Sequence, residues 1–174
     1  LRVSSSHSKL SLASKFGVHA DEAAPVLMAA RQVADALGIC FHVGSQCMEA
    51  GAYSTTLGYV RDLLTQTDVK LDMIDVGGGF PSAYPGMTPP PLADYMAEIR
   101  SAIATLPGSS DLQVLCEPGR ALVAEGGAVL VRVDLRKGNM LYINDGSFGS
   151  LYDAAHTDFA YPVKAVRNEG EFAS

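Results

Sequence analysis

Three short segments of the sequence combine glycine with polar side chains that can bind an anion. They are "FHVGSQ" at 41–46, "DVGGGFP" at 75–81 and "CEPGR" at 116–120. Glycine lets backbone N–H groups approach an anion closely, a serine hydroxyl can donate a hydrogen bond, and a guanidinium can bind an anion bidentately. These residue types together favour a phosphate site. The candidate residues are His42, Ser45, Gly77, Gly78, Gly79, Glu117, Gly119 and Arg120.

Each segment also has a simpler explanation. Three successive glycines can form a tight turn and nothing more. A histidine at the end of a strand is more often structural than catalytic, and Glu117 with Arg120 could form a surface ion pair that contributes little. The recurrence of three such segments at equivalent positions favours a ligand site, although it does not identify the ligand.

The segments follow predicted strands in a regular alternation of strands and helices. Apolar periodicity predicts helices at 21–38, 53–64 and 92–106, the first capped by Asp21 and stopped by Gly38. Short strands are predicted at 39–43, 71–76 and 112–116. This alternation predicts parallel strands that are covered by helices and buried on both faces. Ligands bind at the carboxyl ends of such strands, which is where the three segments lie.

The composition excludes several classes of partner. The 174 residues carry a net charge of −6, from 19 acidic and 13 basic residues that form no basic stripe, so nucleic acid is not expected. No apolar stretch approaches the roughly 18 residues of a membrane helix, so no membrane association is expected. Cys40, Cys47 and Cys116 match no CxxC spacing. They predict neither a metal site nor a disulfide framework, and they favour a reducing cytoplasm.

The pattern changes near residue 124, where helices give way to strands. Two strand-like runs, 128–135 and 140–144, are joined by a turn at Lys137-Gly138-Asn139 with no helix between them. Such a pair is expected to be antiparallel. The sequence therefore predicts two domains, an α/β domain at 1–123 and a β-rich domain at 124–174 that is cut off at Ser174.

The motifs "KFGV", "FHVGSQC", "DVGGGFP", "CEPGRALVA" and "YINDG", in this order, resemble the fold-type III pyridoxal phosphate (PLP) decarboxylases, which act on ornithine, lysine, arginine or diaminopimelate. The resemblance implies an α/β fold: the later part of a PLP-binding β/α (TIM-like) barrel, followed by the start of a C-terminal β-domain. It also implies a homodimer with shared active sites and a small amino-acid substrate. By the same resemblance, the Schiff-base lysine is expected upstream of Leu1, and the cysteine–aspartate segment that a partner subunit contributes is expected downstream of Ser174.

The resemblance also implies roles for individual residues. Glu117 would contact the pyridine nitrogen of PLP and keep it protonated, and His42 would stack on the ring, which makes these two the candidate catalytic residues. Gly119 and Arg120 would hold the phosphate, with Ser45 and the 77–79 glycines as further donors. Arg2, in "LRVSSS", matches a family arginine near the cofactor.

The substrate side of the site is expected in the second domain. Tyr152 and Asp153, in "SLYDAAH", match the family pair whose aspartate binds the distal amine of the substrate. Asn144-Asp145-Gly146 is interpreted as a plain turn.

Four functions stay open at this point. "GGGFP" and "YINDG" favour an ornithine or lysine decarboxylase of polyamine biosynthesis, and "HVGSQ" is closer to diaminopimelate decarboxylase. A non-catalytic homologue of the antizyme-inhibitor kind would be expected to lose cofactor contacts, which this sequence retains. A PLP carrier or racemase-like barrel ranks last, because it would lack the β-domain context of "YINDG".

Overall fold

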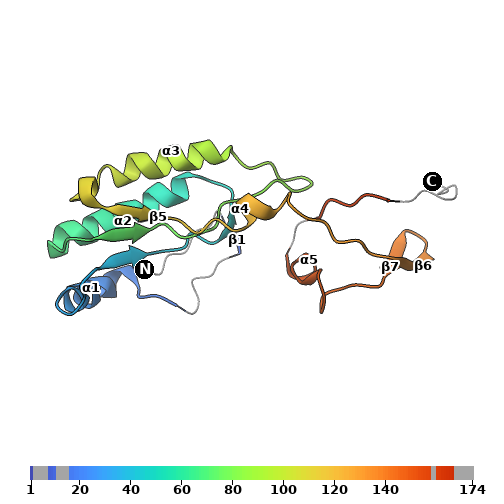
Figure 1. Ribbon diagram of the computed structural model, residues 1–174, viewed down its shortest axis with the longest axis horizontal. Coiled ribbons are helices and arrows are strands. Elements are labelled where there is room, and N and C mark those ends of the chain that lie inside the picture. The colour runs from blue at the N-terminus through green and yellow to red at the C-terminus, as the bar shows by residue number, and fades with distance from the viewer. Residues whose placement is uncertain (2–7, 11–15, 158–159, 167–174) are drawn as a thin grey trace. The chain divides into compact units, whose positions relative to one another are not determined.

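The computed structural model describes residue 1 and residues 8–10, 16–157 and 160–166 (Figure 1). The chain separates into two compact units. The first consists of Leu1–Ser82 and Pro89–Ala128, and the second of Ala83–Thr88 and Val129–Ser174. Each unit is described by itself below. The domain boundary expected at 123/124 stays a prediction.

The first unit is built on a parallel three-stranded sheet. Its strands are β2 (Gly38–Cys40), β4 (Met73–Asp75) and β5 (Gln113–Leu115), in the order β2-β4-β5. Helix α2 (Gly51–Thr67) lies between β2 and β4 in the chain, and α3 (Leu92–Ile103) lies between β4 and β5. This arrangement confirms the expected mixed α/β architecture with parallel strands. Parallel neighbours need a long crossover connection, and here each crossover contains a helix.

Helices α2 and α3 lie side by side along this sheet (Figure 1). Both were predicted within three residues at each end. Helix α3 begins directly after three prolines at 89–91, and proline is tolerated only at the start of a helix. Pro107 lies shortly after the end of α3. None of the described helices is both long enough and apolar enough to cross a lipid bilayer.

One hydrophobic core joins the helices to the sheet. It is centred on fully buried side chains of α2, α3 and β4. Its members are Ala23, Leu27, Leu37, Ile39, Phe41, Val43, Cys47, Ala52, Tyr53, Leu57, Val60, Leu63, Leu64, Ile74, Val76, Phe80, Tyr95, Ile99, Ile103 and Leu106. Because the helices are anchored on this core, the loops that follow β2, β4 and β5 are held at one end of the sheet.

The helix predicted at 21–38 is wrong over its second half. A short 3-10 turn, η1 (Ala20–Glu22), precedes α1 (Ala23–Arg31), and the chain then turns twice before β2 begins at Gly38. Val33, which lies in that second half, is 87% exposed. Leu37 is buried, but it lies in the loop between α1 and β2 and not in a helix.

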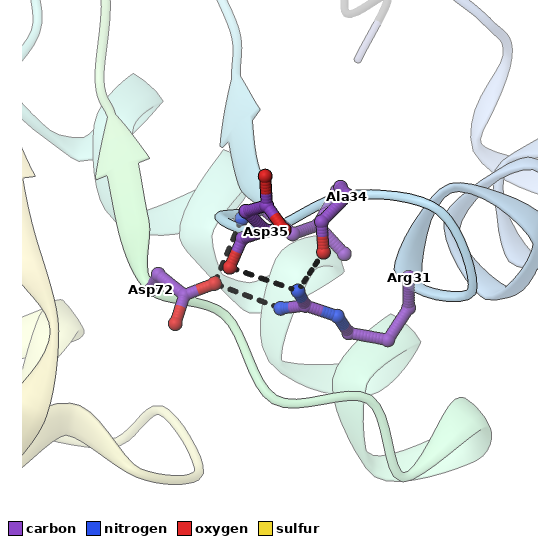
Figure 2. A network of polar contacts seen from close by, with 5 residues as sticks. Arg31, Ala34, Asp35 and Asp72 are labelled. Atoms are coloured by element: carbon purple, nitrogen blue, oxygen red, sulfur yellow. Dashed lines mark hydrogen bonds and ion pairs between the residues drawn. The ribbon is translucent and has the colours of Figure 1, made fainter.

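Contacts between distant segments explain why α1 ends at Arg31 (Figure 2). The Arg31 guanidinium donates hydrogen bonds to Asp72 Oδ2 at 2.7 Å and to the Ala34 carbonyl at 2.5 Å. The same Asp72 oxygen accepts the Leu37 N–H at 2.7 Å. These bonds fold the chain after α1 against the amino end of β4, and no periodicity within 21–38 encodes them.

Strand β5 differs from its prediction in burial. All three of its residues are exposed, including Val114 at 47% and Leu115 at 40%, although a strand buried on both faces was expected. In the described part of the chain, β5 lies at the edge of the sheet and pairs only with β4. Its apolar side chains line an open cavity of about 420 Å³ beside α3.

Three further short elements complete the first unit. Strand β1 (Ser8–Leu10) pairs antiparallel with β3 (Ser45–Cys47), a pairing that the sequence analysis did not predict. The 3-10 turn η2 (Ser109–Asp111) leads into β5, and helix α4 (Arg120–Val123) starts within the "CEPGR" segment.

The second unit contains the expected hairpin. Strands β6 (Val133–Lys137) and β7 (Met140–Ile143) are antiparallel, and their connection uses Gly138 with φ +58°, which confirms the predicted pairing and turn. The first strand begins at Val133 instead of at 128. Asp145 accepts the N–H groups of Gly146 and Ser150, so the "NDG" sequence lies in a turn. Helix α5 (Tyr152–His156) follows.

Candidate functional site

A polar cavity of about 220 Å³ opens at the carboxyl end of the parallel sheet. The residues that line it are His42, Ser45, Gly78, Gly79, Phe80, Glu117, Gly119 and Arg120. Seven of the eight were candidate residues in the sequence, and they come from all three of the segments that follow strands. The structure therefore brings the three segments together, as the carboxyl ends of neighbouring parallel strands require.

The three segments are joined by backbone hydrogen bonds that continue the sheet beyond its strands. Phe41 donates its N–H to the Asp75 carbonyl at 3.2 Å, and Glu117 donates its N–H to the Gly77 carbonyl at 2.8 Å. Gly77 in turn donates its N–H to the Asp75 side chain at 2.8 Å. The cavity wall is thus an extension of the β2-β4-β5 ladder, which fixes the relative positions of the segments.

Each glycine of the "GGG" run is required by its surroundings. Gly77 and Gly79 have φ values of +69° and +98°, which side-chain-bearing residues rarely adopt. A Cβ atom on Gly78 would lie 2.7 Å from the Glu117 carbonyl oxygen and 3.1 Å from His42 Nε2. The run is therefore more than a tight turn, because it also leaves room for the histidine and glutamate segments to approach.

The carbonyl groups of the three glycines all point at hydrogen-bond donors. The Gly77 carbonyl accepts the Glu117 N–H at 2.8 Å, the Gly78 carbonyl accepts the Tyr53 hydroxyl at 2.8 Å, and the Gly79 carbonyl accepts the Cys47 N–H at 2.9 Å. In a trans peptide the N–H points away from the carbonyl of the same unit.

The N–H groups of Gly78, Gly79 and Phe80 consequently face the other way. All three residues line the cavity, and their N–H groups have no hydrogen-bond partner among the described residues. Successive backbone N–H groups in a concave loop form a binding site for an anion. The Ser45 side chain and Arg120 lie at the same cavity, so its donor set matches a phosphate group.

The surroundings of His42 favour its neutral form. Its Nδ1 accepts the Gly44 N–H at 2.9 Å, which requires an unprotonated Nδ1. Burial lowers the pKa of His42, while the negative charge of Glu117 acts in the opposite direction. Both observations favour a neutral imidazole with its proton on Nε2, above the Gly78 backbone.

Glu117 lies beside a second carboxylate. Side-chain ligand atoms of Glu117, Asp75 and Cys40 lie within 4.8 Å of one another, at the ends of β5, β4 and β2. Burial raises the pKa of the Cys40 thiol, and the carboxylates of Asp75 and Glu117 raise it further, so the sulfur stays protonated. Of these three residues, Glu117 lines the cavity, where its carboxylate is opposite in sign to the Arg120 guanidinium.

Arg120 is held by a residue that the sequence analysis did not select. Its Nη1 donates to Gln46 Oε1 at 3.3 Å. Gln46 also bonds the backbone of Ser82, in the segment that follows the glycine run. Gln46 ends the "FHVGSQ" segment, and its position next to Ser45 is the sequence signal that could have identified it. Tyr53 had no local signal, because its bond to Gly78 spans 25 residues.

The cavity does not test the remaining three candidate residues. Arg2 lies outside the described residues, so its role stays a prediction. Tyr152 and Asp153 are on α5 in the second unit, where both side chains are exposed and Tyr152 stacks on His156 at 4.2 Å between ring centroids. Their assignment to the substrate also stays a prediction.

The comparison with protein families identifies the class. Residues 1–124 match the pyridoxal-binding domain of the pyridoxal-dependent decarboxylases. The chain therefore belongs to this family, which confirms the expected family and its cofactor, pyridoxal phosphate.

Individual relatives include enzymes and one regulator. The chain is 30% identical to antizyme inhibitor 2 of Xenopus laevis over 90% of this chain and 40% of the relative, and 34% identical to ornithine decarboxylase of Caenorhabditis elegans over 89% and 42%. It is 31% identical to diaminopimelate decarboxylase of Helicobacter pylori over 82% and 37%. The chain thus spans about two fifths of the length of these relatives.

A solved structure agrees with the fold. Lysine/ornithine decarboxylase of Vibrio vulnificus, complexed with cadaverine, matches with a TM-score of 0.77 and 28% identity, over 91% of this chain and 44% of that chain. The cavity fits the family cofactor on its own chemistry. It places a glycine loop with inward N–H groups and a guanidinium in one cavity with a carboxylate.

Proposed function

We propose that the protein containing this chain uses PLP to decarboxylate ornithine or lysine to a diamine. The observation that carries the proposal is the cavity at the end of the β2-β4-β5 sheet. Its unpartnered N–H groups at Gly78 and Gly79, together with Arg120, suit the cofactor phosphate, and Glu117 suits the pyridine nitrogen. When bound, PLP withdraws the electron pair that remains on the substrate as carbon dioxide departs.

The residues of this chain would then hold and tune the cofactor. Glu117 would keep a proton on the pyridine nitrogen, because a carboxylate beside that atom favours its charged form. Arg120, Ser45 and the Gly77–Gly79 loop would bind the phosphate, with Gly119 leaving space at the start of α4. The neutral imidazole of His42 would orient the ring by stacking on it, and the Gly44 N–H bond fixes that imidazole.

The substrate is proposed from the relatives and from one sequence match. Ornithine decarboxylases recur among the relatives, and the Vibrio vulnificus enzyme is a lysine/ornithine decarboxylase. Asp153 would pair with the distal amine of such a substrate. Diaminopimelate is the alternative, supported by the Helicobacter pylori relative. A regulator without activity is a further alternative, supported by antizyme inhibitor 2. The cavity, with Glu117, Arg120, His42 and Ser45 on its wall, favours an enzyme.

Wider features of the protein follow from the same proposal. Three parallel strands with crossover helices suit part of a TIM-like barrel, and the exposed apolar side chains of β5 suit a sheet that continues beyond it. A homodimer with shared active sites, a cytoplasmic location and a place in polyamine biosynthesis would complete the proposed family role. The three cysteines are free thiols, which suits a reducing compartment.

The test is cofactor binding followed by an assay of carbon dioxide release. The complete protein is titrated with PLP and then given ornithine, lysine, arginine or diaminopimelate. We expect PLP binding and release of carbon dioxide from ornithine or lysine. A preference for diaminopimelate would support the first alternative, and PLP binding with no release from any substrate would support the regulator. Absence of PLP binding would overturn the proposal.

A variant pair ties the result to the cavity. Arg120→Ala should weaken PLP binding by about ten- to a hundred-fold, because a hydrogen bond to a charged group contributes roughly 1.5–3 kcal/mol. Arg61→Ala is the matched control, since Arg61 is exposed on α2 and pairs with Asp62. If both variants bound PLP like the parent, Arg120 would not be a phosphate ligand.

A further inference from the structure

Gln46 is an unusual residue for its position. It is 1% exposed, and Gln46 and Thr56 are the polar side chains in the buried set of the described residues. Its φ is +53°, in the left-handed region that a side-chain-bearing residue adopts at some cost in energy. A buried amide in a strained backbone conformation persists only where its surroundings hold it there.

The surroundings of Gln46 consist of two other loops at the cavity. Its Nε2 donates to the Ser82 carbonyl at 2.6 Å, and its Oε1 accepts the Ser82 N–H at 3.2 Å. The same Oε1 accepts the Arg120 Nη1–H at 3.3 Å. Ser82 Oγ donates to the Arg120 carbonyl at 3.1 Å. Gln46 thus links β3, the segment after the glycine run and the first residue of α4.

We infer that Gln46 is a positioning residue that directs the Arg120 guanidinium toward the phosphate of the cofactor, an inference that rests on the function proposed above. An arginine side chain has several rotatable bonds, so its guanidinium gives a defined bidentate contact only when something fixes its direction. The Gln46 oxygen is such a fixed point, because Ser82 holds the amide on both sides.

The chemistry of the amide suits this role. A carboxylate at the same place would bind the guanidinium more strongly, but it would offset the positive charge that attracts the phosphate. A neutral amide oxygen orients the guanidinium without adding a negative charge beside it. The amide also donates to the Ser82 carbonyl, which a carboxylate cannot do.

The inference predicts an effect that depends on the phosphate and on Arg120. In the complete protein, Gln46→Met should weaken binding of PLP about tenfold, as the loss of one hydrogen bond to a charged group implies. Binding of pyridoxal, which has no phosphate, should be unchanged. In a protein that already carries Arg120→Ala, adding Gln46→Met should leave PLP affinity unchanged, because the two residues act through one contact.

Two further variants separate positioning from folding. Thr56→Val changes the other buried polar residue, whose hydroxyl bonds the Ala52 carbonyl within α2, and should lower stability without altering the PLP-to-pyridoxal affinity ratio. Gln46→Gly suits the left-handed backbone and provides a folded protein if Gln46→Met does not fold. It should show the same phosphate-dependent loss.

The outcomes distinguish this inference from the function on which it rests. If the parent protein did not bind PLP, the proposed function would fail first. If the parent bound PLP but the Gln46 variants lost PLP and pyridoxal affinity equally, the positioning role would be overturned and the proposed function would stand. Additive losses from Gln46→Met and Arg120→Ala would overturn it in the same way.

Discussion

Replacing Tyr53 by phenylalanine removes a single oxygen atom that lies behind the glycine loop. Tyr53 is fully buried on α2, stacks on Phe80 at 5.0 Å between ring centroids, and donates its hydroxyl to the Gly78 carbonyl at 2.8 Å. Burial raises the pKa of Tyr53, so the hydroxyl stays a donor at all working pH values. The variant keeps the ring and its packing, and it leaves the Gly78 carbonyl without its donor.

The expected size of the effect follows from that one bond. A buried carbonyl that loses its partner lowers the free energy of unfolding by about 1–3 kcal/mol. The peptide between Gly78 and Gly79 would also lose its fixed orientation, and with it the direction of the Gly79 N–H. Loss of one hydrogen bond to the phosphate would weaken PLP binding by up to about a hundred-fold, since such bonds contribute roughly 1.5–3 kcal/mol.

Tyr95→Phe is the matched control. Tyr95 is also fully buried, contacts Tyr53 and Phe80 edge-on, and donates its hydroxyl to a backbone carbonyl at 2.9 Å, but that carbonyl belongs to Cys47. Urea unfolding should show similar losses for the two variants, while a PLP titration should show a loss for Tyr53→Phe alone. Equal PLP affinities in both variants would refute the argument that Tyr53 sets the orientation of the glycine peptide.

Three other perturbations test separate parts of the site. Glu117→Gln should bind PLP yet slow carbon dioxide release, because an amide does not stabilise the protonated pyridine; an unchanged rate would remove Glu117 from that role. Asp153→Ala should raise KM for ornithine or lysine, because the substrate ammonium would lose its counter-charge; parental kinetics would place the amine site elsewhere. The pKa of His42 is lower in the folded chain than its ordinary value of about 6.5. As pH falls below that value, the His42 imidazole is therefore protonated in the unfolded chain before it is protonated in the folded chain. The free energy of unfolding should therefore decline through that window, and His42→Gln should flatten the decline in urea titrations at several pH values; an identical decline would assign it to other groups.

The alternation of strands and helices was predictable because its signals are local. Periodicity gave α2 and α3 nearly to their ends, and the turn at Lys137-Gly138-Asn139 gave the hairpin. The helix at 21–38 failed because the bonds from Arg31 and Leu37 to Asp72 span 41 and 35 residues, and these bonds redirect the chain. The antiparallel pairing of β1 with β3 has no local signal either.

The residues of the candidate site also differ in whether a local sequence signal identifies them. Residues that directly follow strands were found, because parallel strands bring their carboxyl ends together whatever the helices contain. Residues that act from behind the site were not found. Gln46 reaches Ser82 and Arg120 across 36 and 74 residues, and nothing in the composition of "FHVGSQ" separates a supporting residue from a ligand. The roles of the residues on the wall of the cavity stay predictions.

The carbonyls of Gly77, Gly78 and Gly79 are each anchored by a different partner, in Glu117, Tyr53 and Cys47. A flexible glycine loop would lose conformational entropy when it closed around an anion, and glycine loses more than any other residue. Here that entropy is already lost when the chain folds, because the three bonds form without the ligand. The loop would therefore meet the proposed phosphate as a preorganised surface, so more of the gross interaction energy would remain as affinity. The conformational freedom of glycine allows the chain to adopt this backbone conformation during folding, and the folded loop is no longer flexible.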